Sequence, residues 1–237
     1  MHIHLIEASL EPERALVSAD ALEATVPIAG HVVHMPSHIY VRVGKYGKAV
    51  ENNVRSQEVD RQFTDLWGDY PLPNIGTYPL SHRLHAGHAL DFIRYAATVQ
   101  GNYKTASEAA SRMANRVIGD TVMVQGGQKR VSAPWLVLKI FGKWDELLAL
   151  TPAYQGTPYL DGIWSYSLGS AFLAKGNMGA AFRELVNLRM IAEAPNADEY
   201  RVGATPVSAV LQLAAFGLEG EISVSYTHLT LPTNRGV

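Results

Sequence analysis

The stretch Gly30–Ser56, GHVVHMPSHIYVRVGKYGKAVENNVRS, decides the fold, because it joins two expected helices at a glycine. We expect one helix over 30–43 and a second over about 45–63, with Gly44 at the corner between them. Glycine suits this corner because a helix C-terminus commonly needs a residue in the left-handed conformation. Tyr46 would fill the gap between the paired helices, and the small Ala49 would let them approach closely. The stretch therefore predicts a helical hairpin.

The same pattern recurs three times downstream. In register, the corner glycines are Gly44, Gly101, Gly142 and Gly176, the large residues two places later are Tyr46, Tyr103, Trp144 and Met178, and the residues five places later are Ala49, Ala106, Leu147 and Ala181. Only the last two glycines match the 34-residue tetratricopeptide period. The repetition predicts an all-α fold, an α-solenoid of stacked antiparallel hairpins, with a generic helical bundle as the alternative.

A resemblance to a known family supports this prediction. The unit 164–188 resembles a tetratricopeptide repeat well, whereas 33–56 and 90–113 resemble it less closely. The runs IHLIEASLEPERAL, GHVVHMPSHIYVRVGKYGKAVENN and FGKWDELLAL also resemble a family of large bacterial tetratricopeptide-repeat proteins. That family tends to show a His-Asn-x-His-Phe run. In this chain His88 matches the first histidine of the run, and Asp91 stands in place of the second. The resemblance implies an internal fragment of a longer protein and no particular reaction.

The rest of the chain divides by composition. Residues 1–222 are expected to form one helical repeat domain, interrupted near 64–87 by an irregular loop rich in proline, glycine and aromatic residues. A polar, glycine-rich connector is expected over 119–134, and a last helix over about 206–216. Residues 223–237 are polar and β-branched, which predicts a non-native tail. A natural disordered tail is the alternative.

Composition also narrows the classes of partner. The chain of 237 residues is 47% hydrophobic and 18% charged with a net charge of -2, which is ordinary globular composition. The basic residues are scattered, so we expect no nucleic acid partner. We expect no membrane span, because no apolar run approaches about 18 residues. There is no cysteine, and hence no disulfide and no thiolate zinc site. This composition is compatible with a cytoplasmic location.

Histidines are concentrated in the first 90 residues, in three groups. They are His2 and His4 near Glu7, then His31, His34 and His38, then His82, His85 and His88 near Asp91. In a helix, the side chains of His4 and Glu7 lie on the same face, and so do those of His34 and His38. Such pairs on facing helices could supply nitrogen and oxygen ligands to zinc, iron or another divalent ion. The predicted metal ligands are His4, Glu7, His34, His38, His88 and Asp91.

Pro36 complicates the one-turn pairing of His34 with His38. The helix either kinks at this proline or begins there. If Pro36 lies in the first turn of a helix, His34 stands at or before the cap and the pairing fails.

Three functions fit these residues. The first is a scaffold that binds a peptide or protein partner in a concave groove. Its expected groove residues are His31, His34, His38, Tyr40, Asn52 and Asn53. The second is a metal-dependent enzyme or metal-binding domain using the histidine and carboxylate cluster on the N-terminal helices. The third is a structural role inside a larger enzyme. The sequence contains no phosphate loop, nucleophile elbow or zincin run, and it names no substrate.

Overall fold

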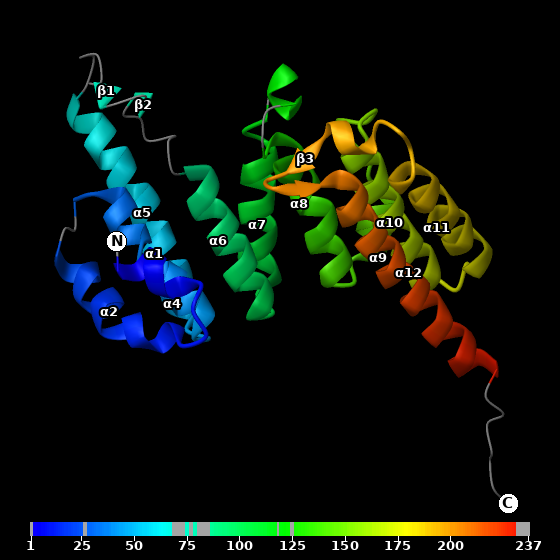
Figure 1. Cartoon of the computed structure of the whole chain (residues 1–237), viewed down its shortest axis with the longest axis horizontal. Coiled ribbons are helices and arrows are strands. Elements are labelled where there is room, and N and C mark those ends of the chain that lie inside the picture. The colour runs from blue at the N-terminus through cyan, green and yellow to red at the C-terminus, as the bar shows by residue number, and fades with distance from the viewer. Residues whose placement is uncertain are drawn as a thin grey trace, which may run out of the picture. The chain divides into compact units, whose positions relative to one another are not determined.

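The computed structural model is mostly helical and describes residues 2–25, 28–67, 74–75, 78–79, 86–117, 119–123 and 126–230. Contacts between backbone positions divide the chain into two compact units, Met1–Met113 and Ala114–Val237. Figure 1 shows the first unit in blue to green and the second in green to red. The expected all-α class is confirmed, and the two units are described separately.

Unit 1 is built around one long helix. In chain order its elements are α1 (His2–Glu7), the 3-10 helix η1 (Pro12–Ala15), α2 (Leu16–Thr25), α3 (Gly30–His34), α4 (Ser37–Arg42), α5 (Tyr46–Trp67), β1 (Asn74–Ile75), β2 (Tyr78–Pro79), α6 (Ala86–Val99) and α7 (Tyr103–Ala114). The long α5 packs against α3, α4 and α6, and α1 packs against α4. The short strands β1 and β2 pair antiparallel, with Asn74 opposite Pro79. They lie within the expected irregular loop, most of which is outside the described residues.

The expected single helix over 30–43 is two helices. Helix α3 ends at His34, and α4 begins at Ser37 with Pro36 as its N-cap. Both Met35 and Pro36 nevertheless keep right-handed helical backbone angles, and the amide of Tyr40 still donates to the carbonyl of Pro36 at 3.0 Å. Because the chain continues to turn through the proline, His34 and His38 remain about one turn apart.

Small residues allow the helices of unit 1 to pack closely. Ala15, Ala19 and Ala49 are fully buried with Ile39 and Tyr40. The hydroxyl of Tyr40 donates to Asp20 Oδ1 at 2.7 Å, so its polar end is satisfied at the edge of the core.

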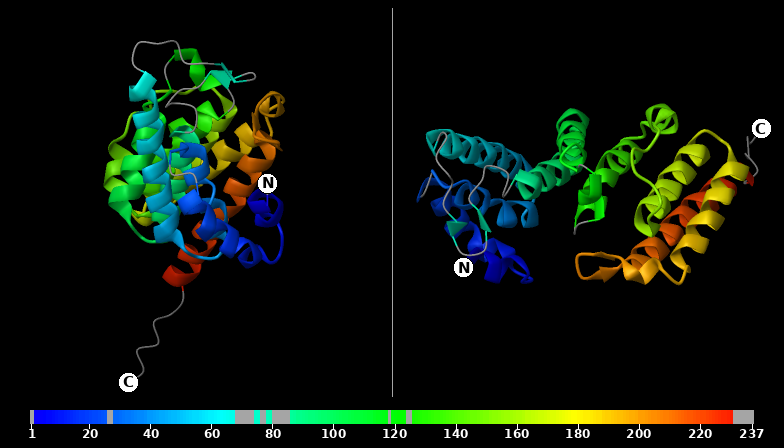
Figure 2. Two further views of the ribbon diagram at one scale, coloured as in Figure 1. Left: turned by 90° about the vertical axis from the view of Figure 1, so that its left-hand side faces the viewer. Right: turned by 90° about the horizontal axis from the view of Figure 1, so that it is seen from above.

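Unit 2 is a second set of helices. Its elements are the 3-10 helix η2 (Gly119–Met123), α8 (Gly127–Ile140), α9 (Trp144–Ala149), α10 (Pro158–Ala174), α11 (Met178–Ala192), the 3-10 helix η3 (Ala197–Glu199), β3 (Arg201–Val202), β4 (Thr205–Pro206) and α12 (Val207–Thr230). The strands β3 and β4 pair antiparallel, with Arg201 opposite Pro206. Helices α10, α11 and α12 pack against one another, as the right-hand view of Figure 2 shows.

Two expected boundaries in unit 2 are wrong. The connector expected over 119–134 gives way to α8 at Gly127, and Pro134 lies inside that helix. The last helix does not stop at Phe216 but continues through Gly217 and Gly220 to Thr230, inside the segment 223–237. Glycine costs a helix only about 1 kcal/mol, so packing against neighbouring helices can carry the helix through it.

The four predicted hairpin corners are confirmed. The glycines have φ angles of +78°, +71°, +64° and +78° in chain order, at Gly44, Gly101, Gly142 and Gly176. At each corner the amide after the glycine donates to the carbonyl five residues before it, at 2.8–2.9 Å. This bond defines the Schellman motif, which ends a helix and reverses the chain. The next helix begins in every case at the large residue, which is Tyr46, Tyr103, Trp144 or Met178.

Helix α12 also bears on the expectation of no membrane span. By length and composition alone, Val207–Ser225 could cross a membrane, with a mean hydropathy of 1.3. This finding corrects the expectation that no segment approaches such a length. One helix of this kind is weak evidence for a span. Helix α12 packs against α10 and α11, and its Glu221 forms an ion pair with Lys139 at 2.8 Å.

Candidate metal centre

Four helices of unit 1 bring the imidazole rings together. His4 and Glu7 come from α1, His34 from α3, His38 from α4 and His88 from α6. The close packing of α3 on α5 begins at Gly30, where an added Cβ would lie 2.8 Å from the carbonyl oxygen of Ser56. The hydroxyl of Ser56 donates to the carbonyl of Gly30 at 2.7 Å. This contact holds the start of α3 against α5, and His34 follows one turn later.

The His34 ring is fixed by Asn53 of α5. Both side chains are fully buried, and His34 Nδ1 lies 2.6 Å from Asn53 Oδ1. The Asn53 amide nitrogen donates to Ser37 Oγ at 2.8 Å and to the carbonyl of Ala49 at 2.7 Å. Because Nδ2 is used as the donor in both bonds, Oδ1 must be the acceptor, and His34 donates from Nδ1. The lone pair of neutral His34 is therefore on Nε2.

His34 Nε2 faces a second imidazole. It lies 3.0 Å from His38 Nε2, and the two rings meet edge to face with centroids 4.8 Å apart. The pairing of His34 with His38 thus survives the break at Pro36.

The other nitrogen of His38 faces Glu7 of α1. Nδ1 lies 2.6 Å from Glu7 Oε2, and His4 Nδ1 lies 3.5 Å from the same oxygen. Glu7 Oε2 is buried, yet no well-directed hydrogen bond reaches it from the part of the chain that the structure describes. A carboxylate at this distance favours a proton on His38 Nδ1. His38 would then present its own lone pair on Nε2.

His88 and Phe92 of α6 complete the ring cluster. The His88 ring centroid lies 4.7 Å from that of His34 and 5.6 Å from that of His38. Phe92, one helical turn after His88, contacts all three rings with centroids 4.8–5.0 Å apart. His88 is exposed, so this side of the cluster is open to solvent.

Burial keeps the two central histidines neutral. It lowers the pKa of His34 from 6.5 to about 3, against the opposing effect of the Asn53 hydrogen bond. It lowers the pKa of His38 to about 4, and the neighbouring histidines lower it further. Neutral imidazole is the form that binds a metal ion.

These side chains form two groups whose ligand atoms are close enough to hold a metal ion. One group is His34, His38 and His88, and the other is His4, Glu7 and His38, with ligand atoms within 4.8 Å of one another in each. Asp91, the sixth predicted ligand, lies in neither group, and its Oδ1 pairs with Arg94 at 2.7 Å. His82 and His85 lie outside the described residues.

The residues predicted to line a groove are mostly buried. Tyr40 and Asn53 are fully buried and Asn52 is 3% exposed, while His31 is exposed. Tyr40 and Asn53 bond within unit 1, so they stabilise its packing. They offer no open surface to a peptide.

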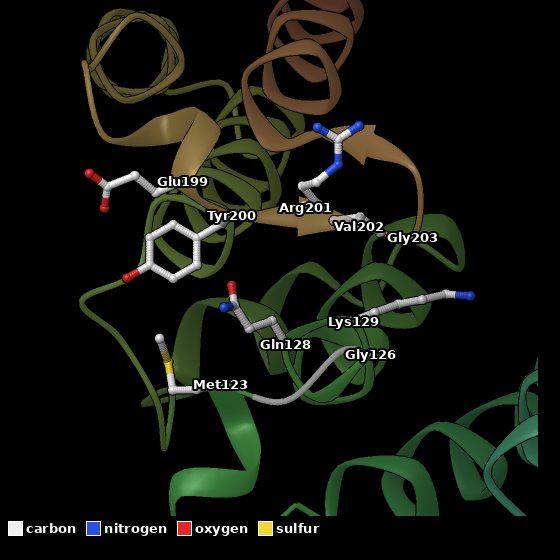
Figure 3. Close-up of a pocket in the computed structure, with 9 residues that line it drawn as sticks. All are labelled: Met123, Gly126, Gln128, Lys129, Glu199, Tyr200, Arg201, Val202 and Gly203. Atoms are coloured by element: carbon white, nitrogen blue, oxygen red, sulfur yellow. The ribbon is translucent and has the colours of Figure 1, made fainter.

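Two cavities are relevant to ligand binding. In unit 1, a cavity of about 380 Å³ lies among α1, α2 and α3, and both His4 and His31 line it. In unit 2, a cavity of about 340 Å³ lies between the start of α8 and the β3 strand (Figure 3). There Gln128 points toward the space beneath Tyr200, whereas the Arg201 guanidinium extends away from it.

Two contributions to the cluster were not predicted. Asn53 was assigned to a groove, and its role in orienting His34 depends on the packing of α3 against α5. Phe92 was not among the expected site residues, although its spacing of four residues from His88 already put both rings on one helix face.

Comparison of the chain with protein-family models, curated proteins and solved structures finds no match.

Proposed function

We propose that unit 1 is a metal-binding domain in which His34, His38 and His88 hold one divalent transition-metal ion. The observation that carries the proposal is the 3.0 Å separation between His34 Nε2 and His38 Nε2. Asn53 accepts from His34 Nδ1, so His34 turns the lone pair of Nε2 toward His38, and Glu7 Oε2 lies 2.6 Å from the opposite nitrogen of His38. A cation bound by both Nε2 atoms would take the place of a hydrogen bond between them.

The separation suits a shared ion. Zinc binds imidazole nitrogen at about 2.0–2.1 Å, so two ligands of a tetrahedral ion are roughly 3.3 Å apart. A small outward movement of either ring would accommodate the ion. His88 provides a third imidazole on the same side of the cluster.

The neighbours of the ligands fit the same proposal. A metal-binding histidine almost always donates its other N–H to a carboxylate, a carbonyl or water, which fixes its tautomer and orientation. Asn53 Oδ1 accepts from His34 in this way, and Glu7 Oε2 lies 2.6 Å from His38 Nδ1, close enough to accept from it after a small rotation of either side chain. Glu7 is therefore a positioning residue in this proposal, and His4 its neighbour on α1.

The ligand set is compatible with zinc. Imidazole suits zinc, copper, iron and nickel, and zinc binds such sites more tightly than Fe²⁺. Three protein ligands leave a fourth position for water or a substrate, as in catalytic zinc sites. An ion held in this way would act as a Lewis acid or lower the pKa of its bound water.

The test is calorimetric titration of the tag-free, metal-stripped full chain with Zn²⁺ at pH 7.5. We expect one ion per chain for the wild type and at least a hundredfold weaker binding for His34→Ala and His38→Ala. His2→Ala is the matched control, since His2 belongs to neither group of ligands, and it should bind zinc as the wild type does. The absence of stoichiometric binding by the wild type would overturn the proposal.

Further variants decide between the two groups of ligands. Glu7→Gln should weaken zinc binding by about 10- to 100-fold, the usual effect of changing a residue that orients a ligand. His88→Ala should weaken it more. The reverse order would place the ion instead at His4, Glu7 and His38.

We also propose that the hairpins belong to a tetratricopeptide-like solenoid. The four equivalent glycine corners and the small or apolar residue that each buries support this proposal. A peptide or protein partner would then bind to residues other than the buried Tyr40, Asn52 and Asn53. Crosslinking of the full chain with mass spectrometry tests the stacking, because it measures distances between successive hairpins.

A further inference from the structure

The cavity of unit 1 shares a wall with the histidine cluster. His4 lines the cavity, and its ring contacts that of His38 with centroids 4.8 Å apart. His31 also lines the cavity, and its ring stacks on that of His34 at 6.1 Å. The cavity therefore borders the two imidazole rings that contact the proposed ligands His38 and His34.

The rest of the cavity wall is largely apolar. Ile3 of α1, Leu22 of α2, and Val32 and Met35 contribute hydrocarbon surface. The polar residues of the wall are His2, His4, Ser18 and His31, of which His4 and His31 contact the cluster. The volume of about 380 Å³ is within the range of sites for small molecules. A mostly apolar wall with a few polar groups is the usual composition of such sites.

We propose that this cavity binds the apolar group of a small molecule whose anionic oxygen donors reach the metal ion. The inference rests on the proposed metal site and adds the class of its ligand, a short alkyl or aryl compound with a carboxylate-like head group. The open coordination position would take the head group. The hydrocarbon would pass between His4 and His31 and displace water from the surfaces of Leu22 and Val32.

The size of the expected effect follows from the buried hydrocarbon. Each methylene transferred from water to an apolar site raises the affinity about fourfold. A chain that buries two or more methylenes should therefore gain at least about tenfold over a head group alone. A ligand that touches only the metal would gain nothing from a longer chain.

The experiment compares two hydroxamates, which share a metal-binding head group and differ in chain length. Acetohydroxamate and octanohydroxamate are titrated into the zinc-loaded full chain. We expect octanohydroxamate to bind at least tenfold more tightly. Leu22→Trp and Ser18→Trp place an indole in the cavity and should remove this preference without changing zinc affinity. Val17→Trp, on the same helix but 81% exposed, is the matched control and should keep the preference.

The outcomes separate this inference from the metal site itself. Stoichiometric zinc binding with equal affinity for both hydroxamates would overturn the inference and leave the proposed function standing. Octanohydroxamate that binds equally well to the zinc-free chain would also overturn it, because the head group would not reach the metal. Failure of the wild type to bind zinc would overturn both proposals.

Discussion

Units 1 and 2 use the same hairpin corner but enclose different interiors. In unit 1 the buried polar side chains bond across elements, as between His34 and Asn53 or between Ser56 and Gly30. In unit 2 buried hydroxyls also bond across helices, as between Ser170 and Glu221 at 2.6 Å and between Ser165 and Asn187 at 2.8 Å, but no histidine lies between residues 114 and 227. The repeated corner thus sets the architecture, and the two units differ in the kind of polar side chain that joins their helices.

Packing in unit 2 also depends on glycines that leave room for side chains of a neighbouring helix. Gly162 and Gly169 of α10 pack against leucines of α12. A Cβ added at Gly162 would lie 2.5 Å from Leu211, and one added at Gly169 would lie 2.5 Å from Leu218. The two leucines fill the space that the glycines leave, beside the bond from Ser170 to Glu221 that joins the same two helices. We expect the following effects from the differences between the two units.

The largest expected effect is that zinc stabilises unit 1 alone. At a free zinc concentration a thousandfold above the dissociation constant, we expect stabilisation by about 4 kcal/mol. Hydrogen exchange measured by mass spectrometry should show slower exchange in α3, α4 and α5, reversed by a chelator. Equal protection of α10 and α11 would contradict the contrast between the units.

The second prediction concerns overpacking in unit 2. Gly169→Val should destabilise unit 2 by about 3 kcal/mol, because the added carbons meet both Leu218 and Glu184. The measurement is denaturant unfolding followed by exchange of α10 amides. Gly220→Ala is the control, since nothing lies within 4 Å of its added Cβ, and it should cost nothing.

The third prediction is that metal-free unit 1 loses stability in acid. The folded pKa values of His34 and His38, about 3 and about 4, lie below the unfolded value of 6.5. The unfolded chain therefore binds more protons, and the stability present above pH 6.5 is lost as the pH falls toward these values. Burial raises the pKa of Asp60 to about 6, which opposes this loss.

We expect a net loss of about 2 kcal/mol between pH 7 and pH 5, measured by urea unfolding at each pH. Asp60→Asn removes the opposing carboxyl and should make the loss steeper. Unit 2 contains no histidine between residues 114 and 227, so exchange of its amides is the internal reference. A loss of the same size in unit 2 would refute the assignment to the histidines.

The fourth prediction uses two adjacent asparagines. Asn53→Ala should destabilise unit 1 by about 2 kcal/mol, because it leaves His34, Ser37 and Ala49 without their buried partner. Asn52 is also buried, but its Nδ2 makes no hydrogen bond within the described residues. Asn52→Ala should therefore cost less than about 1 kcal/mol in thermal or chemical unfolding. Equal costs would show that the network around His34 is not special.

The smallest expected effect tests whether the corners are equivalent. Gly44→Ala in unit 1 and Gly176→Ala in unit 2 should each cost about 1 kcal/mol, since both glycines have a φ of +78° and space for a Cβ. Denaturant unfolding measures both. Unequal costs would mean that one corner is supported by contacts beyond its own backbone.

The sequence predicted what depends on neighbouring residues. The corners at Gly44, Gly101, Gly142 and Gly176 were predictable because one backbone conformation requires glycine within a few residues of a helix end. The pairing of His34 with His38 was predictable from helical spacing, and the structure shows that Pro36 does not abolish it.

The sequence did not predict contacts between distant elements. The bond from His34 to Asn53 joins residues on separate helices, and the sequence had put Asn53 in a groove. Glu7 and His38 had been grouped as ligands of one ion, but their direct contact at 2.6 Å depends on how α1 packs against α4. The cavity beside His4 and His31 requires α1, α2 and α3 to be in place. The length of α12 was missed because its glycines resemble a helix end, whereas packing on α10 and α11 continues the helix.

The position of His38 between two groups has a consequence for ion uptake. The His38 imidazole faces His34 through Nε2 and Glu7 through Nδ1. A positive charge bound at one ring nitrogen therefore makes the N–H at the other nitrogen more acidic. Binding of a doubly charged cation at Nε2 would acidify the opposite N–H and draw that hydrogen toward the carboxylate. The heat of association should then vary with the ionisation enthalpy of the buffer whenever this hydrogen leaves the protein.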